Sequence, residues 1–246
     1  MSKKIWLVTG GAGFIGSNIA EELVRRGEKV RILDNFSTGK KEHIKNFIGR
    51  VELLKGDIRN LADLKKALKG AALVLHQAAL RSVPKSINNP FETNQVNVEG
   101  TLNLLIAAKN AGVKRVVYAS SSSVYGDSKR FPQREDMKPT PISPYAVSKL
   151  AAENYCVMFA RTYGLETVSL RYFNVFGPRQ DPESMYSAVI PRFMDLLKQR
   201  KSLEIHWDGK QARDFTYVSN VVDANIKAAL AKNISGEVYN IATGQL

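Results

Sequence analysis

The feature that most constrains the fold is a glycine-rich turn near the start of the chain. An apolar run over residues 4–9 meets three evenly spaced glycines, Gly10, Gly13 and Gly16. An amphipathic stretch follows, and a second apolar run, residues 29–33, ends in Asp34. In this order, backbone amides at the helix start hold a pyrophosphate and the acid accepts ribose hydroxyls. The segment therefore predicts a dinucleotide-binding unit.

The rest of the chain repeats the alternation of short apolar runs and amphipathic stretches. Strands are expected at 4–9, 29–33, 51–54, 72–75, 115–119 and 166–170, and helices at 14–26, 61–68, 92–111, 145–163 and 187–199. Such alternation is typical of a parallel sheet covered by helices on both faces. We therefore expect an α/β fold.

A second pattern indicates proton chemistry. Tyr145 and Lys149 stand four residues apart in a helical stretch, so the ammonium can lie beside the phenol. The pKa of a free tyrosine is about 10, and a fixed neighbouring cation lowers it. A run of serines, Ser120 to Ser123, can supply a hydroxyl to the same substrate oxygen. Together these side chains can take a proton from an alcohol.

Further motifs carry a resemblance to a known family. They are Gly56-Asp57-Ile58, His76-Gln77-Ala78-Ala79, Asn97-Val98-Glu99-Gly100-Thr101 and Leu170-Arg171-Tyr172-Phe173-Asn174-Val175-Phe176-Gly177-Pro178. With the glycine turn and the Tyr-x-x-x-Lys pattern, the chain resembles the extended short-chain dehydrogenase/reductases of the nucleotide-sugar epimerase and dehydratase group. The resemblance covers essentially the whole chain and is greatest to UDP-glucose and UDP-N-acetylglucosamine 4-epimerases.

The resemblance implies a role for each residue of the catalytic pattern. Tyr145 matches the base, Lys149 matches the lysine that lowers its pKa, and Ser121 matches the catalytic hydroxyl. Ser122 and Ser123 would face the sugar. Relatives that eliminate water carry an Asp–Glu pair at these two positions, and decarboxylases carry Glu at the second. Because both are serine here, we expect reversible oxidation without elimination.

The expected cofactor is NAD, because Asp34 would repel the 2′-phosphate of NADP and no arginine follows it closely. The implied cofactor contacts are Gly10, Gly13, Phe14, Ile15, Gly16, Asp34, Asn35, Ser37, Thr38, Gly39, Asp57, Ile58, Gln77, Ala78, Ala79, Asn97, Tyr145, Lys149 and Phe173. For Asn97 the sequence leaves a second interpretation open, a turn between packed elements.

The resemblance also implies contacts to a UDP-sugar. They are Arg81, Ser121, Ser122, Ser123, Tyr145, Asn174, Val189 and Arg213. Arg213 matches a guanidinium that grips the diphosphate, since a planar fork suits two oxygens. Arg81 stands where some relatives carry Lys and others Gly, so it could contact phosphate or crowd the site.

Composition argues against several other functions. The net charge is +13, but the basic residues are dispersed, so we expect no nucleic-acid binding and a surface that favours an anionic nucleotide. Three scattered histidines and a lone cysteine, Cys156, predict no metal site and no internal disulfide. No apolar run reaches membrane-spanning length, so we expect a cytoplasmic protein without a membrane segment.

The expected organisation is a Rossmann-type doubly wound parallel sheet with a small C-terminal substrate lobe. Residues 1–175 would bind NAD, and residues 176–246 would supply substrate-lobe segments interleaved with a strand and helix that return to the core. Relatives continue beyond the strand and turn at 237–244, so we expect the lobe to be incomplete in this chain. The helices at 92–111 and 145–163 resemble those that pair relatives into homodimers.

The predicted function is NAD-dependent 4-epimerisation of a UDP-hexose through a transient 4-keto sugar. The substrates would be UDP-glucose and UDP-galactose, their N-acetyl forms, or both. One alternative is a UDP-glucuronate 4-epimerase or another nucleotide-sugar enzyme of the group, since residues 119–126 also resemble that type; residues 171–174 favour the hexose type. A non-catalytic NAD-binding module is a further alternative, but it predicts loss of the Tyr145/Lys149 pair.

Overall fold

A parallel sheet of seven strands forms the centre of the protein, in the order β3-β2-β1-β4-β5-β6-β9. The computed structural model describes residues 4–128, 130–181, 189–203, 205, 208–209 and 212–244. The strands are β1 (Ile5–Thr9), β2 (Lys29–Asp34), β3 (Val51–Lys55), β4 (Ala71–His76), β5 (Arg115–Ser121), β6 (Glu166–Tyr172) and β9 (Glu237–Ile241). This order, with β1 central, is that of a Rossmann-type doubly wound fold. The expected fold class is confirmed.

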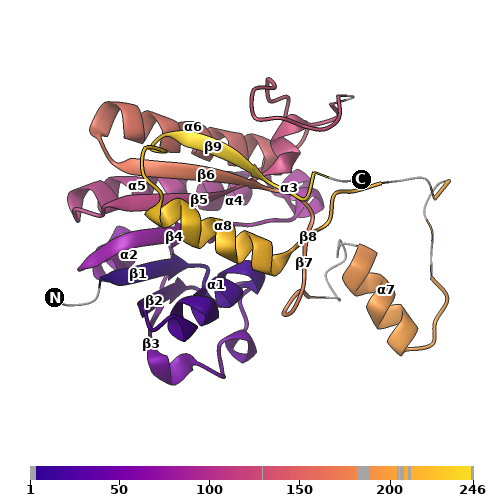
Figure 1. The fold of residues 1–246 in the computed structure, drawn as a ribbon, viewed down its shortest axis with the longest axis horizontal. Coiled ribbons are helices and arrows are strands. Elements are labelled where there is room, and N and C mark those ends of the chain that lie inside the picture. The colour runs from indigo at the N-terminus through magenta and orange to yellow at the C-terminus, as the bar shows by residue number, and fades with distance from the viewer. Residues whose placement is uncertain are drawn as a thin grey trace.

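Helices cover both faces of the sheet (Figure 1). On one face α1 (Phe14–Arg25) packs beside α8 (Val218–Leu230). On the other lie α2 (Leu61–Leu68), α5 (Gly100–Asn110) and α6 (Pro144–Tyr163). Successive strand residues point to opposite faces, so Val8 lies in the buried cluster on the α1 side and Leu7 in the cluster on the α6 side.

The long helix α6 carries the Tyr-x-x-x-Lys pattern, and local signals fix both of its ends. The Ser143 side chain accepts a hydrogen bond from the backbone amide of Ala146, and Pro144 occupies the first turn. Gly164 ends the helix in the left-handed conformation, with φ +69°. Tyr145 is therefore held in the first turn of the helix, beside the end of β5.

The single helix expected over 92–111 is divided. The segment begins within α4 (Pro90–Asn94), which follows the separate helix α3 (Val83–Asn88), continues in a π-helical turn over Gln95–Glu99, and then becomes α5. Single π-helical turns inside α-helices are frequent at functional sites. Here the π-turn contains Asn97.

The C-terminal third combines core elements with outlying ones. The strands β7 (Val175–Phe176) and β8 (Thr216–Tyr217) form a separate two-stranded sheet. Figure 1 shows α7 (Val189–Lys198) standing apart from the helical layers, whereas α8 and β9 return to the core. Of the helix expected at 187–199, residues 187 and 188 lie outside the described residues.

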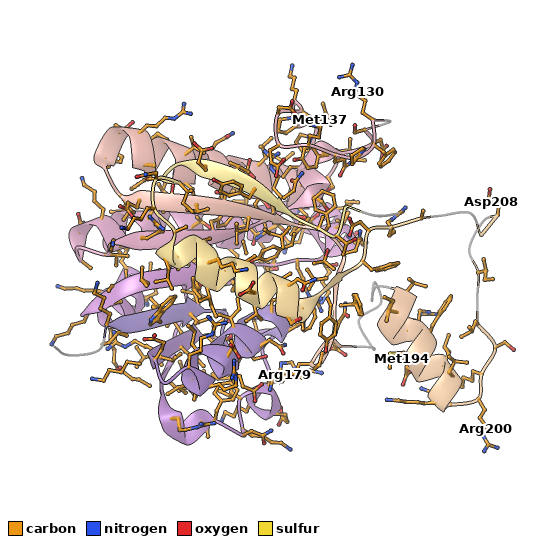
Figure 2. The ribbon with its side chains drawn as sticks, in the orientation of Figure 1. Arg130, Met137, Arg179, Met194, Arg200 and Asp208 are labelled. Atoms are coloured by element: carbon orange, nitrogen blue, oxygen red, sulfur yellow. The ribbon has the colours of Figure 1, made fainter. Side chains whose placement is uncertain are left out.

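Short 3₁₀ turns complete the described structure: η1 (Lys41–His43), η2 (Ile48–Arg50) and η4 (Ser122–Tyr125). The segment between η4 and α6 protrudes from the body, and Figure 2 shows Arg130 and Met137 on it. None of the helices in the described part of the chain has the length and apolar character needed to cross a bilayer.

Candidate cofactor and catalytic site

The glycine turn lies where β1 meets α1, at the carboxyl end of the sheet. Gly10 has φ +65°, and a Cβ built on it would lie 2.8 Å from the backbone of Ala78. A Cβ on Gly16 would lie 2.2 Å from the carbonyl oxygen of Gly10. Gly13 begins α1 without a side-chain cap, so the amides of the first turn are left for a ligand. This cradle fits a pyrophosphate.

Asp34 occupies the end of β2, next to the cradle, and is 7% exposed. Its Oδ2 accepts a hydrogen bond from the Ala12 amide at 2.9 Å, and its Oδ1 accepts one from the Phe36 amide at 2.8 Å. Burial raises the pKa of Asp34, while the two amides act in the opposite direction. Each carboxylate oxygen keeps a second lone pair, which can receive a ribose hydroxyl. The residue therefore fits the ribose of NAD.

The loop after Asp34 is held by its own polar groups. The Asn35 side chain donates to Asp57 Oδ2 at 2.9 Å and accepts from the Ser37 amide at 3.0 Å. A hydrogen bond from the Arg59 guanidinium holds the pKa of Asp57 well below its usual range. Ser37 and Thr38 are exposed, and a Cβ on Gly39 would lie 2.8 Å from Asp34 Oδ1. The loop thus closes around the Asp34 carboxylate.

Two of the cofactor candidates turn their side chains into the protein. Gln77 donates from Nε2 to Asn225 Oδ1 at 3.0 Å and accepts at Oε1 from the Tyr172 hydroxyl at 3.1 Å. Ile58 is buried and lies against Gly100, where a Cβ would be 2.7 Å from its Cδ1. At these positions only the backbone is placed to meet a cofactor. Ala78 and Ala79 follow β4 and are half-buried beside the glycine turn.

Asn97 is 1% exposed and satisfies its side chain within the protein. Its Oδ1 accepts from the Leu80 amide at 2.8 Å, and its Nδ2 donates to the Leu80 carbonyl at 2.9 Å and to Ser148 Oγ at 3.0 Å. The residue ties the loop after β4 to α6. Of the two interpretations left open by the sequence, these contacts favour the packing role.

Tyr145 and Ser121 come together from α6 and β5, as the catalytic pattern predicts. Burial raises the pKa of Tyr145, while a hydrogen bond with the Ser121 side chain and the positive charge of Arg81 act to lower it. Arg81 lies in the loop after β4 and is exposed. Its effect on the phenol was not predicted from the sequence, which placed Arg81 only against the substrate.

Lys149 is arranged differently from expectation. Its Nζ donates to the carbonyl oxygen of Ala119 at 2.8 Å and lies 6.0 Å from the centre of the Tyr145 ring. Burial lowers the pKa of Lys149 to about 7. Burial raises the pKa of Tyr145 in this arrangement, and the groups that oppose the rise are Ser121 and Arg81. That Lys149 lowers the pKa of Tyr145 stays a prediction.

A buried ion pair near these residues was missed in the sequence. Glu153 and Arg171, which are 2% and 4% exposed, form two contacts of 2.6 and 3.0 Å. Ser120 Oγ donates to Glu153 Oε2 at 2.6 Å, and Arg171 Nη1 donates to the Tyr125 hydroxyl at 2.6 Å. Spacing shows only that Glu153, four residues after Lys149, shares its face of α6, and it does not reveal the pairing with Arg171.

Of the candidate substrate residues after β6, Asn174 lies beside the segment that carries Arg213, whereas Val189 lies on α7. Asn174 has φ +29° and donates from Nδ2 to the carbonyl of Asp214 at 3.1 Å. The neighbouring Arg213 is exposed, with Nη1 donating to the Ala212 carbonyl at 2.8 Å. Phe173 is half-buried, its ring centre 6.3 Å from that of Tyr125. Val189 is exposed on α7.

Comparison with known proteins agrees with this geometry. The model of the NAD dependent epimerase/dehydratase family matches residues 6–242. The chain belongs to this family. The UDP-glucose 4-epimerase of Mycolicibacterium smegmatis is 39% identical over 243 residues, which are 97% of this chain and 77% of that protein.

Solved structures of family members are similar over nearly the whole chain. The UDP-N-acetylglucosamine 4-epimerase of Methanobrevibacter ruminantium, in complex with UDP-N-acetylmuramic acid, is 44% identical with a TM-score of 0.94, over 100% of this chain and 78% of that one. The UDP-glucose 4-epimerase of Thermus thermophilus, in complex with NAD, is 38% identical with a TM-score of 0.88, over 98% of this chain and 78% of that one. The predicted family resemblance is confirmed.

Proposed function

We propose that this family member catalyses NAD-dependent 4-epimerisation of a UDP-hexose. The observation that carries the proposal is the meeting of Tyr145 with Ser121 at the carboxyl end of the sheet, beside a glycine cradle and Asp34. Ser122 and Ser123 follow Ser121 without the acidic pair that would drive elimination. Family members named as UDP-glucose and UDP-N-acetylglucosamine 4-epimerases, at 38–44% identity, support the same reaction.

The chain's own residues account for the proton transfer. The Tyr145 phenolate would take the proton of the sugar 4-hydroxyl as general base, and Ser121 would hydrogen-bond the same oxygen. Arg81 and Ser121 favour the phenolate against the burial that opposes it. Bound NAD supplies the hydride acceptor and donor at C4. Positions 122 and 123 are serine, where relatives that eliminate water carry carboxylates. The 4-keto sugar would therefore turn over in the site, take hydride back on its opposite face and regain the proton from Tyr145, so the net change is inversion at C4.

The proposed cofactor contacts follow from the same geometry. The first turn of α1 would hold the pyrophosphate through its backbone amides, and Asp34 would hold the adenosine ribose. Lys149 is proposed to bind the nicotinamide ribose. Its Nζ, which donates to the Ala119 carbonyl oxygen, would either donate a second hydrogen bond to the ribose or give up the bond to Ala119. A buried carboxylate at residue 34 favours NAD over NADP.

We divide the proposed roles along the chain as follows. Residues 1–175 bind NAD, and residues 176–246 supply substrate segments interleaved with α8 and β9, which complete the core. Asn174 and Arg213 are proposed to meet the UDP diphosphate, because their segments are joined through the Asn174–Asp214 hydrogen bond. Val189 on α7 is proposed as a sugar-side contact.

A panel of UDP-sugars tests the function. The full-length protein with NAD is expected to interconvert UDP-glucose and UDP-galactose, or UDP-GlcNAc and UDP-GalNAc, without net NADH, as measured by product chromatography and absorbance at the NADH band. Turnover of UDP-glucuronate alone would move the assignment to the uronate type. Net NADH formation in proportion to product would contradict epimerisation.

We also propose that the protein is a cytoplasmic homodimer paired through α5 and α6. Apolar side chains stay exposed on these two helices and on α3 and α4, which contact α6: Ile106 on α5, Val147 on α6, Ile87 on α3 and Phe91 on α4. A free, buried Cys156 is consistent with a reducing compartment. Two copies that pack these helices together would bury the exposed apolar surface.

Charge introduced on that face is expected to separate the dimer. Ile106→Glu, at a side chain that is 42% exposed on α5, should give a monomer by light scattering, because an unpaired carboxylate opposes burial in an apolar interface. Leu230→Glu on α8, at 62% exposure, is the matched control and should leave the mass unchanged. A wild-type protein that is monomeric at all concentrations tested would contradict the proposed dimer.

A further inference from the structure

Ser123 contacts the catalytic serine directly. In the 3₁₀ turn that follows β5, the Ser123 amide donates to Ser121 Oγ at 3.2 Å, and Ser123 Oγ donates to the same atom at 2.9 Å. Ser121 in turn hydrogen-bonds Tyr145. The three side chains therefore form a row from the turn to the phenol.

The hydrogen-bonding capacity of Ser121 fixes the order within this row. A hydroxyl has one hydrogen to donate and two lone pairs to accept with. Ser123 fills both lone pairs of Ser121 through its amide and its hydroxyl. The single hydrogen of Ser121 is then left for the Tyr145 oxygen, which is the arrangement that stabilises a phenolate.

We propose that Ser123 is a positioning residue whose hydroxyl aims the Ser121 hydrogen at the Tyr145 phenolate. When Tyr145 holds its proton, the phenol can donate to Ser121 and the hydroxyl of Ser121 can turn toward Ser123 Oγ. When the proton has left, Ser123 donates to Ser121 and Ser121 donates to Tyr145. The order of the row reverses as Tyr145 loses and regains its proton, by rotation of two hydroxyls. This role deepens the proposed epimerase function and rests on it for its catalytic meaning.

Other groups near Tyr145 act on the phenol independently of Ser123. Among the described residues, Arg81 faces it from the loop after β4, Lys149 lies 6.0 Å from its ring centre on α6, and Tyr118 interacts with it from β5. These groups are the same in variants of the serine run. A difference between such variants therefore isolates the hydrogen-bonded row.

The pH profile of kcat/KM tests the proposal. The bond between Ser123 and Ser121 is present in both states, but it is stronger when the row ends on the phenolate, because hydrogen bonds to an ionised group are about twice as strong as neutral ones. Loss of the Ser123 hydroxyl therefore costs the phenolate state more, so the pKa of Tyr145 rises and the ascending limb moves to higher pH. In Ser123→Ala the shift is expected to be between about 0.4 and 1 pH unit, the size of one net hydrogen bond. Ser123→Thr keeps a hydroxyl and should restore the wild-type limb. Ser128→Ala, on the segment between η4 and α6 and outside the row, should leave the position of the limb unchanged.

The same substitution made in a Ser121→Ala protein distinguishes an effect through the hydrogen-bonded row from an effect of direct contact between Ser123 and the sugar. In Ser121→Ala the route to Tyr145 is cut, so adding Ser123→Ala should move the limb no further. An undiminished second shift, or a Ser123→Ala limb at the wild-type position, would overturn the proposal. Tyrosinate absorbance, measured as the difference from a Tyr145→Phe background, reads the same shift without catalysis. It would still decide the proposal if the protein failed to epimerise any UDP-sugar.

Discussion

Tyr145→Phe is expected to lower kcat by about 10²–10⁴-fold, the usual contribution of a positioned acid–base group. The substitution removes only the phenolic oxygen, which is the atom that Ser121 bonds and that Arg81 polarises. The ring and the first turn of α6 remain, so the fold and the glycine cradle are unaffected. Steady-state rates on a UDP-hexose should show the loss of kcat, and calorimetry should show that the affinity for NAD is unchanged.

The matched control is Tyr163→Phe on the same helix. Tyr163 is 47% exposed, and its ring packs 4.8 Å from that of Phe159, far along α6 from the serine run. It should retain wild-type kcat. A Tyr145→Phe protein that keeps its rate would show that another group removes the proton, and one that no longer binds NAD would show that the phenol is part of the cofactor site.

Glu153→Ala is expected to destabilise the protein by about 3–5 kcal/mol, because it leaves the Arg171 guanidinium buried without its partner. Glu153 and Arg171 are 2% and 4% exposed, so water cannot replace the lost carboxylate. For a chain of this length the melting temperature should fall by roughly 6–20 °C. Thermal unfolding followed by circular dichroism measures the loss.

The double variant Glu153→Leu/Arg171→Met distinguishes a charge effect from a packing effect. Removal of both charges in favour of apolar groups should recover most of the loss, since the penalty comes from an unpaired ion and not from a missing contact. The surface pair Arg25–Glu22 on α1 is the control, and Glu22→Ala should lower the melting temperature much less than Glu153→Ala, because water can replace the lost partner of Arg25. A double variant as unstable as Glu153→Ala would contradict this explanation.

The elements that the sequence predicted well are those with strong local signals. The glycine turn, Asp34 and the strands around them appear where expected, because glycine spacing and β-rich runs are local properties. Helix α8 lacked such signals: it follows β8 directly, and Tyr217 begins it without a side-chain cap. The division of the helix at 92–111 also depends on tertiary contacts, since Asn97 is held by Leu80 and Ser148 from other segments.

The sequence indicates which residues form the site, but it does not indicate their hydrogen bonds or the shifts in their pKa. Spacing along α6 places Tyr145 and Lys149 on one face, yet it does not show that Lys149 Nζ bonds the Ala119 carbonyl or that burial raises the pKa of Tyr145. Both facts arise from the packing of α6 against β5. The same packing brings Arg171 to Glu153 from a strand eighteen residues later, a pairing that no helical pattern can reveal.

The fate of the hydrogen at C4 tests the central claim most directly. A UDP-hexose that carries deuterium at C4 should give the C4 epimer with the deuterium still at C4 and no net NADH, measured by mass spectrometry and NMR. That result is required if hydride leaves and returns at C4 while Tyr145 only removes and returns the proton of the 4-hydroxyl. Loss of the label to solvent, or its appearance in a net reduced cofactor, would contradict the account.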